Sequence, residues 1–309
     1  MKKLLAIATI LFSVTAQAAE EGCGKNYSAV VFEEKTGDVL FQKRAEAYAY
    51  PASLVKMMTL YLTFEALEKG KLKEDQLLTV SDRGEEIARV NKSNTLRLKA
   101  GGKISVRTAI EAVIVKSFNE AAVTLAEGVA GSEWQFAQKM NEKALQLGMT
   151  NSSFRNASGL HEEGQYTTAF DLARLSKAIK KDFPKYYPLF ALKKFSYLGT
   201  KYETHNHVLV SYKGAEGMKT GFTNASGFNL ISAAKKRDDR VISILTGCAS
   251  VQRRDKATKK LLDDAFEKIA EKKWEDPENQ ICLPLSSGFN YGEDGEVAYE
   301  DEMMFGEAQ

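Results

Sequence analysis

Ser53 and Lys56 have the residue types and the spacing that catalysis by a serine nucleophile requires. They begin and end a Ser-Leu-Val-Lys segment, and side chains three positions apart lie on one face of a helix. A neutral lysine at that position can take the proton of the serine hydroxyl. Because a free lysine titrates near pH 10.4, neutrality near pH 7 costs about 4 kcal/mol, which burial and a second cation nearby must supply.

Two further motifs carry the remaining polar groups. Lys219–Gly221 reads Lys-Thr-Gly on a predicted strand, where the lysine is the second cation and the threonine hydroxyl can bind a carboxylate. Its glycine lets the backbone of a substrate approach closely. Ser117 and Asn119 flank Phe118 at a predicted turn between two helices, and they supply a second hydroxyl and a side-chain amide. Together the three motifs predict acyl transfer through a serine.

Two of the motifs occur a second time, in contexts that do not suit catalysis. A second Ser-x-x-Lys runs over Ser232–Lys235, but it lies on a predicted strand, where positions three apart face opposite sides. A second Lys-Thr-Gly, Lys35–Gly37, lies in a predicted hairpin turn before any candidate nucleophile. The ordered set of one motif on a helix, one at a turn and one on a strand is typical of the serine enzymes that penicillin acylates.

The elements that must position these motifs predict an α+β domain. The residues 28–33 and 39–43 flank a glycine turn and predict an opening hairpin, and later strands are expected over 217–223, 227–233 and 241–245. Helices are expected over 53–69, 82–90, 106–116, 119–129, 136–147, 168–180 and 255–274. This order predicts one antiparallel sheet formed by both ends of the chain and flanked by helices, with an all-helical insertion over about 74–181.

Composition excludes several classes of protein. The 309 residues are 44% hydrophobic and 27% charged, which indicates a folded chain. The net charge of +2 is too balanced for nucleic acid to be an expected partner. No run of 18 uncharged apolar residues is present, so a polytopic membrane protein is excluded. We expect no cofactor and no metal, since the cysteines are widely spaced and form no Cys-x-x-Cys.

The two ends of the chain differ from its body. Residues 1–18 combine two lysines, an apolar stretch and a small-residue cleavage site, which predicts a signal peptide and export to the periplasm or cell envelope. There, Cys23, Cys248 and Cys282 can form at most one disulfide, and the sequence does not decide the pair. The enzyme domain is expected over 19–274, and residues 275–309 form an acidic tail without Lys or Arg.

The charge of the body is opposite to that of the tail. Residues 19–273 contain 41 basic and 31 acidic groups, a net charge of +10. We expect the tail to be solvated, and the alternative is that it folds back onto the basic body.

The chain resembles the low-molecular-mass penicillin-binding proteins, which are D-alanyl-D-alanine carboxypeptidases and related endopeptidases of the bacterial cell wall. The resemblance spans about residues 27–270 and is carried by Pro51–Thr59, Phe154–Leu160 and Glu216–Thr223. It implies a β-lactamase/transpeptidase-like fold. It also implies the muropeptides of peptidoglycan as substrates and β-lactam antibiotics as covalent inhibitors.

The resemblance implies a role for each residue of the three motifs. Ser53 would be the acylated nucleophile, Lys56 its general base, and Ser117 the relay of a proton to the leaving amine. The remaining roles concern substrate binding: Asn119 for the substrate amide, Lys219 and Thr220 for the terminal carboxylate, Gly221 for the approach of a substrate strand, and the backbone N–H groups of Ser53 and Phe222 for the oxyanion.

Two features depart from the family pattern. Phe118 stands where the family usually has glycine. Longer members also carry a β-rich second domain and an amphipathic membrane anchor, for which the 35 residues after Trp274 are too few and too acidic. We therefore expect no stable membrane anchor.

Other enzymatic functions stay open as alternatives. A DD-endopeptidase that opens D-Ala-diaminopimelate cross-links would use the same residues. A class A β-lactamase needs Glu-x-x-Leu-Asn, and Glu142–Gln146 is a near miss that ends in Gln, on a helix where Leu145 is expected in the core and Glu142 in solvent.

Metal sites and simple adsorption are weaker alternatives. His161–Gln165 resembles the start of a zincin helix but has Gln in place of the second His. His205 and His207 would share a face if they lay on a strand, and a structural or substrate-lining role is expected for them. A non-catalytic protein that adsorbs to anionic cell-wall polymer through its basic body is the last alternative.

Overall fold

The computed structural model describes Cys23 and residues 27–90 and 94–275. The predicted signal peptide, Cys282 and the tail from residue 276 onward lie outside the described residues. Residues up to Ile269 belong to one unit, and a second unit begins at Ala270. No helix of the described part of the chain is long and apolar enough to cross a membrane.

A five-stranded antiparallel sheet joins the two ends of the first unit. Its order is β2-β1-β9-β8-β7. The strands are β1 (Ser28–Glu33), β2 (Val39–Lys43), β7 (Ala215–Thr223), β8 (Gly227–Lys236) and β9 (Asp239–Cys248). In the register, Ala29 of β1 lies opposite Leu245 of β9, and Ile244 of β9 lies opposite Ile231 of β8. The predicted sheet is confirmed, and β7 is left at an edge where a substrate can lie beside it.

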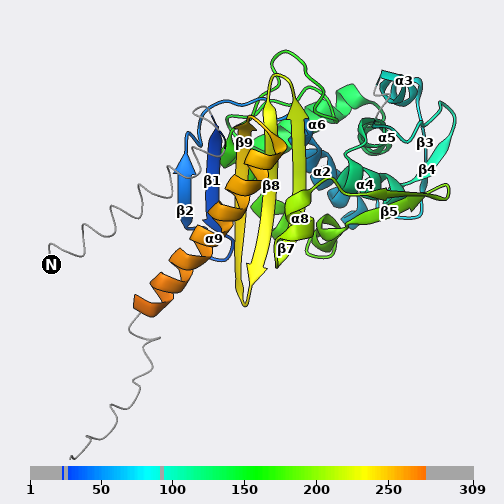
Figure 1. Ribbon diagram of the computed structural model, residues 1–309. Coiled ribbons are helices and arrows are strands. Elements are labelled where there is room, and N and C mark those ends of the chain that lie inside the picture. The colour runs from blue at the N-terminus through cyan, green and yellow to red at the C-terminus, as the bar shows by residue number, and fades with distance from the viewer. Residues whose placement is uncertain (1–22, 24–26, 91–93, 276–309) are drawn as a thin grey trace, which may run out of the picture. The chain divides into compact units, whose positions relative to one another are not determined.

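Alternation along the strands gives the sheet two buried faces. In β1, Val30 and Phe32 pack into one core together with the helices of the insertion. Ala29 and Val31 point the other way, into a core shared with Leu261 and other residues of the last helix. This helix is α9 (Val251–Glu275), and Figure 1 shows its part up to Ile269, which belongs to the first unit, along one face of the sheet. Helices on both faces therefore bury the middle of the sheet.

The helices lie close to the ranges that their capping residues predict. The long helices between the two parts of the sheet are α2 (Lys56–Glu68), α3 (Asp82–Val90), α4 (Val106–Lys116), α5 (Asn119–Ala130), α6 (Glu133–Gln146) and α7 (Ala169–Asp182). The hydroxyl oxygens of Ser105 and Thr168 accept hydrogen bonds of 3.1 Å from the backbone three residues on, which satisfies N–H groups that a helix start leaves free. As predicted, α2 is buried along almost all its length.

The insertion is not all-helical, and several short elements have no clear sequence signal. A two-stranded ribbon, β3 (Leu77–Thr79) with β4 (Lys103–Ser105), lies inside it. A second hairpin follows, β5 (Lys194–Tyr197) with β6 (Thr200–Glu203). The remaining short elements are η1 (Ala52–Val55), η2 (Tyr187–Ala191) and α8 (His207–Ser211). Three- and four-residue strands with few buried side chains are too short for a periodic pattern to indicate them.

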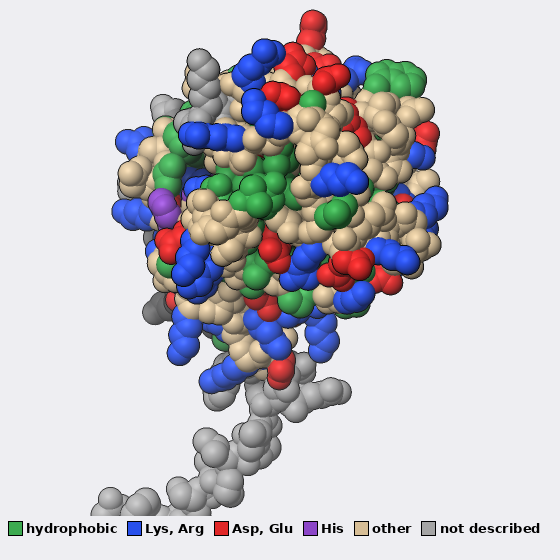
Figure 2. Space-filling view, turned by 90° about the vertical axis from the view of Figure 1, so that its right-hand side faces the viewer, with side chains coloured by type: hydrophobic (Ala, Val, Ile, Leu, Met, Phe, Trp, Pro, Cys, Tyr) green, Lys and Arg blue, Asp and Glu red, His purple; other side chains and the backbone are tan. Residues whose placement is uncertain are grey.

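Charged side chains of both signs share the surface. On the face that Figure 2 shows, Lys and Arg side chains are interspersed with Asp and Glu around a small hydrophobic area. On this face the basic excess of the body does not form a single-sign patch.

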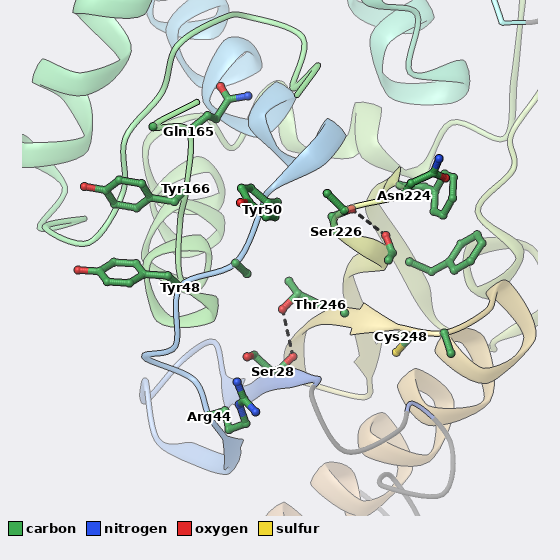
Figure 3. Close-up of a pocket in the computed structure, with 18 residues that line it drawn as sticks. Ser28, Arg44, Tyr48, Tyr50, Gln165, Tyr166, Asn224, Ser226, Thr246 and Cys248 are labelled. Atoms are coloured by element: carbon green, nitrogen blue, oxygen red, sulfur yellow. Dashed lines mark hydrogen bonds between the residues drawn. The ribbon is translucent and has the colours of Figure 1, made fainter. Parts of the chain in front are cut away.

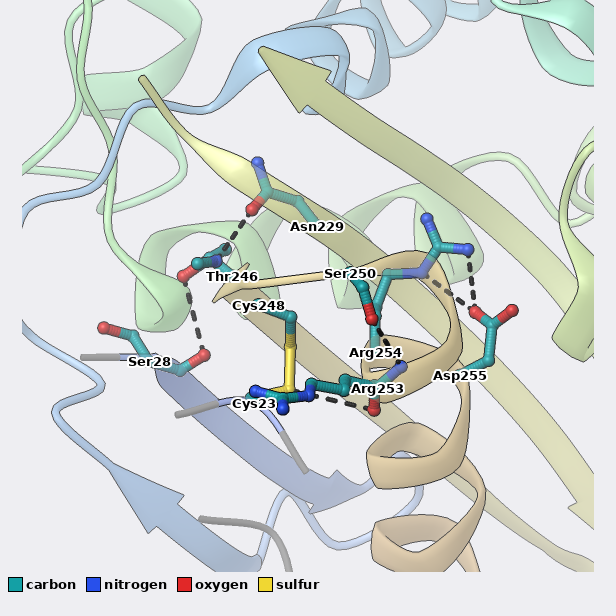
Figure 4. The surroundings of a disulfide bond; sticks show 10 residues. Cys23, Ser28, Asn229, Thr246, Cys248, Ser250, Arg253, Arg254 and Asp255 are labelled. Atoms are coloured by element: carbon teal, nitrogen blue, oxygen red, sulfur yellow. Dashed lines mark hydrogen bonds and ion pairs between the residues drawn. A yellow bond between two sulfur atoms is a disulfide. The ribbon is translucent and has the colours of Figure 1, made fainter. Parts of the chain in front are cut away.

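A disulfide ties the start of the described chain to the sheet. It joins Cys23 to Cys248 at the end of β9, across 225 positions of sequence, and both side chains are buried in the core beside α9. Figure 4 shows the bridge next to Arg253 and Arg254 of that helix. The structure thus assigns the pair that the sequence left open.

Removing this bridge should destabilise the fold. We expect the double variant Cys23→Ser/Cys248→Ser to lose about 3 kcal/mol of unfolding free energy, because a long covalent loop no longer restricts the unfolded chain. Urea unfolding followed by circular dichroism measures the loss, with Cys282→Ser as the control. Equal unfolding midpoints for the double variant and the parent chain would contradict the assigned pair.

Candidate active site

The turn before Ser53 aims its hydroxyl at Lys56. Ser53 lies in η1 and Lys56 is the first residue of α2, so the two side chains are one turn apart. The Lys56 Nζ lies 3.0 Å from the Ser53 Oγ. Ala52 has a left-handed backbone with φ of 48°. The glycine at 159 lies so close to Ala52 that a Cβ there would clash with the Ala52 carbonyl oxygen, so only glycine fits at this position.

The Lys56 amine is fully buried among oxygen atoms. Besides Ser53, it contacts the Asn119 Oδ1 at 2.6 Å and the backbone carbonyl oxygen of Ser158. Burial lowers the pKa of Lys56 well below its ordinary value, and the positive charge of Lys219 lowers it further. Lys219 is the second cation that the sequence predicts. When it is neutral, this lysine has a lone pair with which to accept the proton of Ser53.

Ser117 and Asn119 lie at the junction of α4 and α5. Ser117 ends α4 in the left-handed conformation, with φ of 61°, and this turn redirects the chain so that Asn119 can reach Lys56. The Ser117 Oγ is buried and has no hydrogen-bond partner among the described residues. Ser117 lines the active-site cavity, so this hydroxyl can bond to a polar group of a bound molecule.

Phe118 has a backbone conformation at this turn that does not require glycine. Its φ of −62° is ordinary for any residue, and its ring is buried. The ring packs edge-on against Phe195 and Tyr202 of the β5–β6 hairpin, with centroids 6.3 and 5.4 Å away. The departure from the family pattern is therefore a packing contact that connects the turn to this hairpin.

The β7 strand brings the third motif against η1. At Gly221, a Cβ would lie 3.2 Å from the Pro51 carbonyl oxygen and 3.3 Å from the Leu54 nitrogen. The backbones of β7 and η1 are thus nearly in contact, which brings Phe222 next to the Ser53 turn. Lys219 is buried, and its Nζ donates to the Thr220 carbonyl oxygen at 2.9 Å. Burial, together with the charge of Arg254, lowers the pKa of Lys219 to about 7.

These segments surround one cavity of about 380 Å³. Six of the eight site residues predicted from the sequence line it: Ser53, Ser117, Asn119, Thr220, Gly221 and Phe222. Lys56 and Lys219 are buried, and their nitrogen atoms contact residues of this lining. The crevice thus contains a hydroxyl next to a buried amine, with a second hydroxyl, a side-chain amide and a second amine beside them. With this arrangement the serine oxygen can attack a carbonyl carbon and take over the acyl group.

Two further residues line the cavity: His205, for which the sequence analysis expected a structural or substrate-lining role, and Arg254, which it did not identify. The His205 Nε2 lies 2.6 Å from the Thr220 Oγ1, and burial lowers the pKa of His205 to about 3, helped by the charge of Lys219. A neutral imidazole therefore fixes the Thr220 hydroxyl. Arg254, in the first turn of α9, also lines the cavity and is paired with Asp255 at 2.7 Å. No local signal marks Arg254, because only the fold brings α9 to this crevice.

The two repeated motifs lie away from the cavity lining. Ser232 is buried in β8 and its hydroxyl donates to the Gly217 carbonyl oxygen at 3.2 Å, whereas Lys235 is exposed. The second Lys-Thr-Gly lies in the turn between β1 and β2, where the Thr36 hydroxyl donates to Glu33. Both contexts match those predicted from the sequence.

Some details predicted for the rival chemistries are wrong. Leu145 was expected in the core but is 68% exposed, because α6 buries the adjacent stripe that contains Met140 and Ala144. Glu142 is exposed, as predicted, and it does not line the cavity. His205 and His207 do not share a strand: His205 precedes α8 and His207 begins it, where its Nδ1 pairs with Asp255 at 3.2 Å. No cluster of metal-binding side chains occurs in the part of the chain that the structure describes.

Comparison with known proteins gives consistent matches. The family model described as D-alanyl-D-alanine carboxypeptidase matches residues 15–250. The D-alanyl-D-alanine carboxypeptidase DacF of Bacillus subtilis is 33% identical over 278 residues, which are 85% of this chain and 69% of that protein. The chain spans between 60 and 69% of the length of this and the next curated relatives.

Solved structures share the fold. Penicillin-binding protein 5 of Haemophilus influenzae has a TM-score of 0.75 at 31% identity, and the match covers 78% of this chain and 70% of that one. Penicillin-binding protein D2 of Listeria monocytogenes, in its ampicillin-bound form, has a TM-score of 0.68 at 30% identity, over 79% of this chain and 97% of that one. These likenesses confirm the predicted fold class.

Phe118 should be essential for both stability and the geometry of the turn. We expect Phe118→Gly to lose about 4 kcal/mol of unfolding free energy, since a large buried ring disappears, and to react more slowly with a fluorescent penicillin. Phe118→Leu retains most of the buried volume and is the control. Unfolding midpoints and labelling rates of Phe118→Gly equal to those of the parent chain would contradict this role.

Proposed function

Because the chain belongs to the D-alanyl-D-alanine carboxypeptidase family, we propose that it removes the terminal D-alanine from peptidoglycan stem peptides through an acyl-enzyme at Ser53. The observation that carries the proposal is the buried Lys56 amine, 3.0 Å from the Ser53 hydroxyl. The Ser232 hydroxyl, in the second Ser-x-x-Lys, bonds instead to the Gly217 carbonyl oxygen.

Acylation would proceed in two steps, attack by the serine and departure of the amine. Lys56 takes the proton of Ser53, and the serine oxygen attacks the carbonyl carbon of the penultimate D-alanine. The oxyanion that forms is held by the backbone N–H groups of Ser53 and Phe222. The C–N bond then breaks as the proton on Lys56 passes through the Ser117 hydroxyl to the departing amine. D-Alanine leaves, and the rest of the peptide is an ester of Ser53.

Deacylation would use the same groups with water as the nucleophile. Lys56, neutral again, takes a proton from water, and the hydroxide adds to the ester carbonyl. Collapse of the second oxyanion returns the proton to the Ser53 oxygen and releases the shortened peptide as an acid. A β-lactam would form the same ester, but its leaving group stays attached to the acyl part, which supports covalent inhibition.

The terminal carboxylate of the substrate would be held by the Lys219 side of the cavity. Lys219 supplies the positive charge and Thr220 a hydroxyl whose partner is the neutral His205. Arg254 adds a second positive charge at the cavity wall. Asn119, already in contact with Lys56, would bind the substrate amide, and the backbone of β7 from Gly221 onward would pair with an extended peptide.

The proposed place of action is the periplasm or cell envelope. Support comes from the predicted signal peptide and from the Cys23–Cys248 disulfide, because such bridges persist in oxidising compartments. Incubation with purified muropeptides tests the reaction itself. Loss of monomeric pentapeptide with release of D-alanine is expected, whereas consumption of cross-linked dimer alone would identify an endopeptidase.

Covalent labelling tests the nucleophile. We expect a fluorescent penicillin to label the parent chain and Ser232→Ala, and to leave Ser53→Ala unlabelled, because the Ser53 hydroxyl lies beside Lys56 whereas that of Ser232 bonds to backbone. Fluorescence of the denatured protein on a gel measures the adduct. Label that survives in Ser53→Ala would contradict the proposed acyl-enzyme.

The pH dependence tests the role of Lys219. Its pKa of about 7 means that the free enzyme loses this positive charge as the pH rises through 7. We expect kcat/KM for a peptide with a free terminal carboxylate to fall on the alkaline side of that value. The matched substrate with an amidated terminus lacks the charge to be bound and should not show this fall. Identical alkaline limbs for both substrates would contradict carboxylate binding by Lys219.

A further inference from the structure

A larger cavity, of about 910 Å³, adjoins the active-site cavity. Phe222 and Phe228 line both, and their rings are stacked with centroids 4.3 Å apart. The two cavities are therefore neighbours, and this aromatic pair lines both. The volume is at the upper end of the range for small-molecule sites, and the proposed reaction at Ser53 does not require it.

One wall of the larger cavity is an exposed aromatic group, Tyr48, Tyr50 and Tyr166, which we call the tyrosine wall. These side chains are 67, 46 and 37% exposed, and the rings of Tyr48 and Tyr166 meet edge to face at 4.9 Å. Figure 3 shows the three on one side of the cavity, with Asn224 and Ser226 on the other. Three exposed rings gathered at a cavity are a common feature of ligand sites.

The rest of the lining is polar and almost uncharged. Asn224 offers an exposed side-chain amide. Gln165 and Ser226 are buried, and their polar atoms bond to neighbouring backbone. Arg44 is the only charged side chain in the lining. A zwitterionic peptide side chain would need a carboxylate to hold its ammonium group, and the described lining contains none. Aromatic rings with neutral hydrogen-bonding groups suit a sugar, whose C–H faces pack on rings while its hydroxyl and acetamido groups bond to amides.

The position of this cavity fits the direction of a bound substrate. A terminal carboxylate at Lys219 and Thr220 leaves the rest of the peptide to run along β7 past Phe222, toward the turn at Asn224–Ser226. That turn lines the larger cavity. A stem of four extended residues spans about 13 Å, and the sugar of peptidoglycan is attached at its amino end. The amino end therefore lies on the side of the tyrosine wall.

We propose that the tyrosine wall and its cavity bind the N-acetylated amino sugars of the glycan strand that carries the stem peptide. The proposal rests on the proposed peptidoglycan substrate and names the part of it that lies beyond the scissile bond. The cavity would thus favour stems still attached to glycan over free peptides.

Two substrates that differ only in the sugar test this site. The measurement is kcat/KM for a disaccharide-pentapeptide and for the same pentapeptide without the disaccharide. We expect the parent chain to prefer the glycosylated substrate by on the order of fivefold. Tyr48→Ala and Tyr166→Ala should each remove most of that preference while leaving hydrolysis of the free pentapeptide and penicillin labelling unchanged. Tyr48→Phe should keep it, because the ring remains.

Trp134→Ala is the matched control. This tryptophan on α6 is 71% exposed and lies outside the lining of the cavity, so its removal should leave the preference intact. A second measurement, saturation-transfer NMR with the free disaccharide, reports sugar binding without catalysis. The signal should be present for the parent chain and for Trp134→Ala, and reduced for Tyr48→Ala.

The outcomes separate this site from the proposed function. Equal kcat/KM values for both substrates in the parent chain, with no saturation transfer, would overturn the glycan site while hydrolysis and penicillin labelling stand. An equal loss of activity toward both substrates in Tyr48→Ala would also overturn it, since the wall would then bind peptide. If Ser53 is not labelled and neither substrate is hydrolysed, the proposed function fails, and saturation transfer alone then decides whether the wall binds sugar.

Discussion

The burial of one lysine amine is the constraint on which this site depends. Lys56 can act on the Ser53 hydroxyl only while its nitrogen is neutral, and neutrality depends on removal from water and on the charge of Lys219 nearby. Its neighbours Asn119 and Ser158 present oxygen atoms that fix the nitrogen in place. The site therefore requires that segments from three distant parts of the chain close around this amine.

The scaffold meets this requirement at the edge of its sheet. The η1 turn that leads into α2 packs against β7, and the turn between α4 and α5 closes over the site, held by the contact of Phe118 with the β5–β6 hairpin. Burial of two lysines has a cost. Because Lys219 has a pKa of about 7 when folded and near 10.4 when unfolded, the unfolded chain binds more protons between those values. This lysine thus makes the fold less stable at neutral than at alkaline pH.

Much of this arrangement follows from sequence, because catalysis needs short motifs and regular elements carry them. The motif residues Ser53, Lys56 and Ser117 lie where their helix and turn signals predict. Features that depend on tertiary contact were not predictable: the pairing of Cys23, the approach of Arg254 on the last helix, and the short β3–β4 and β5–β6 ribbons. The exposure of a leucine on α6 shows the same limit, since the orientation of a helix depends on what packs against it.

The protonation state of Lys56 in the resting protein tests this account most directly. Protein labelled with ¹⁵N at the lysine side chains can be titrated by NMR, and Lys56→Arg assigns the resonance by its absence. We predict that the Lys56 nitrogen titrates well below the ordinary range of lysine and shifts when Lys219 is replaced by a neutral residue. A Lys56 resonance that titrates near pH 10.4, as for a free lysine, would contradict the account.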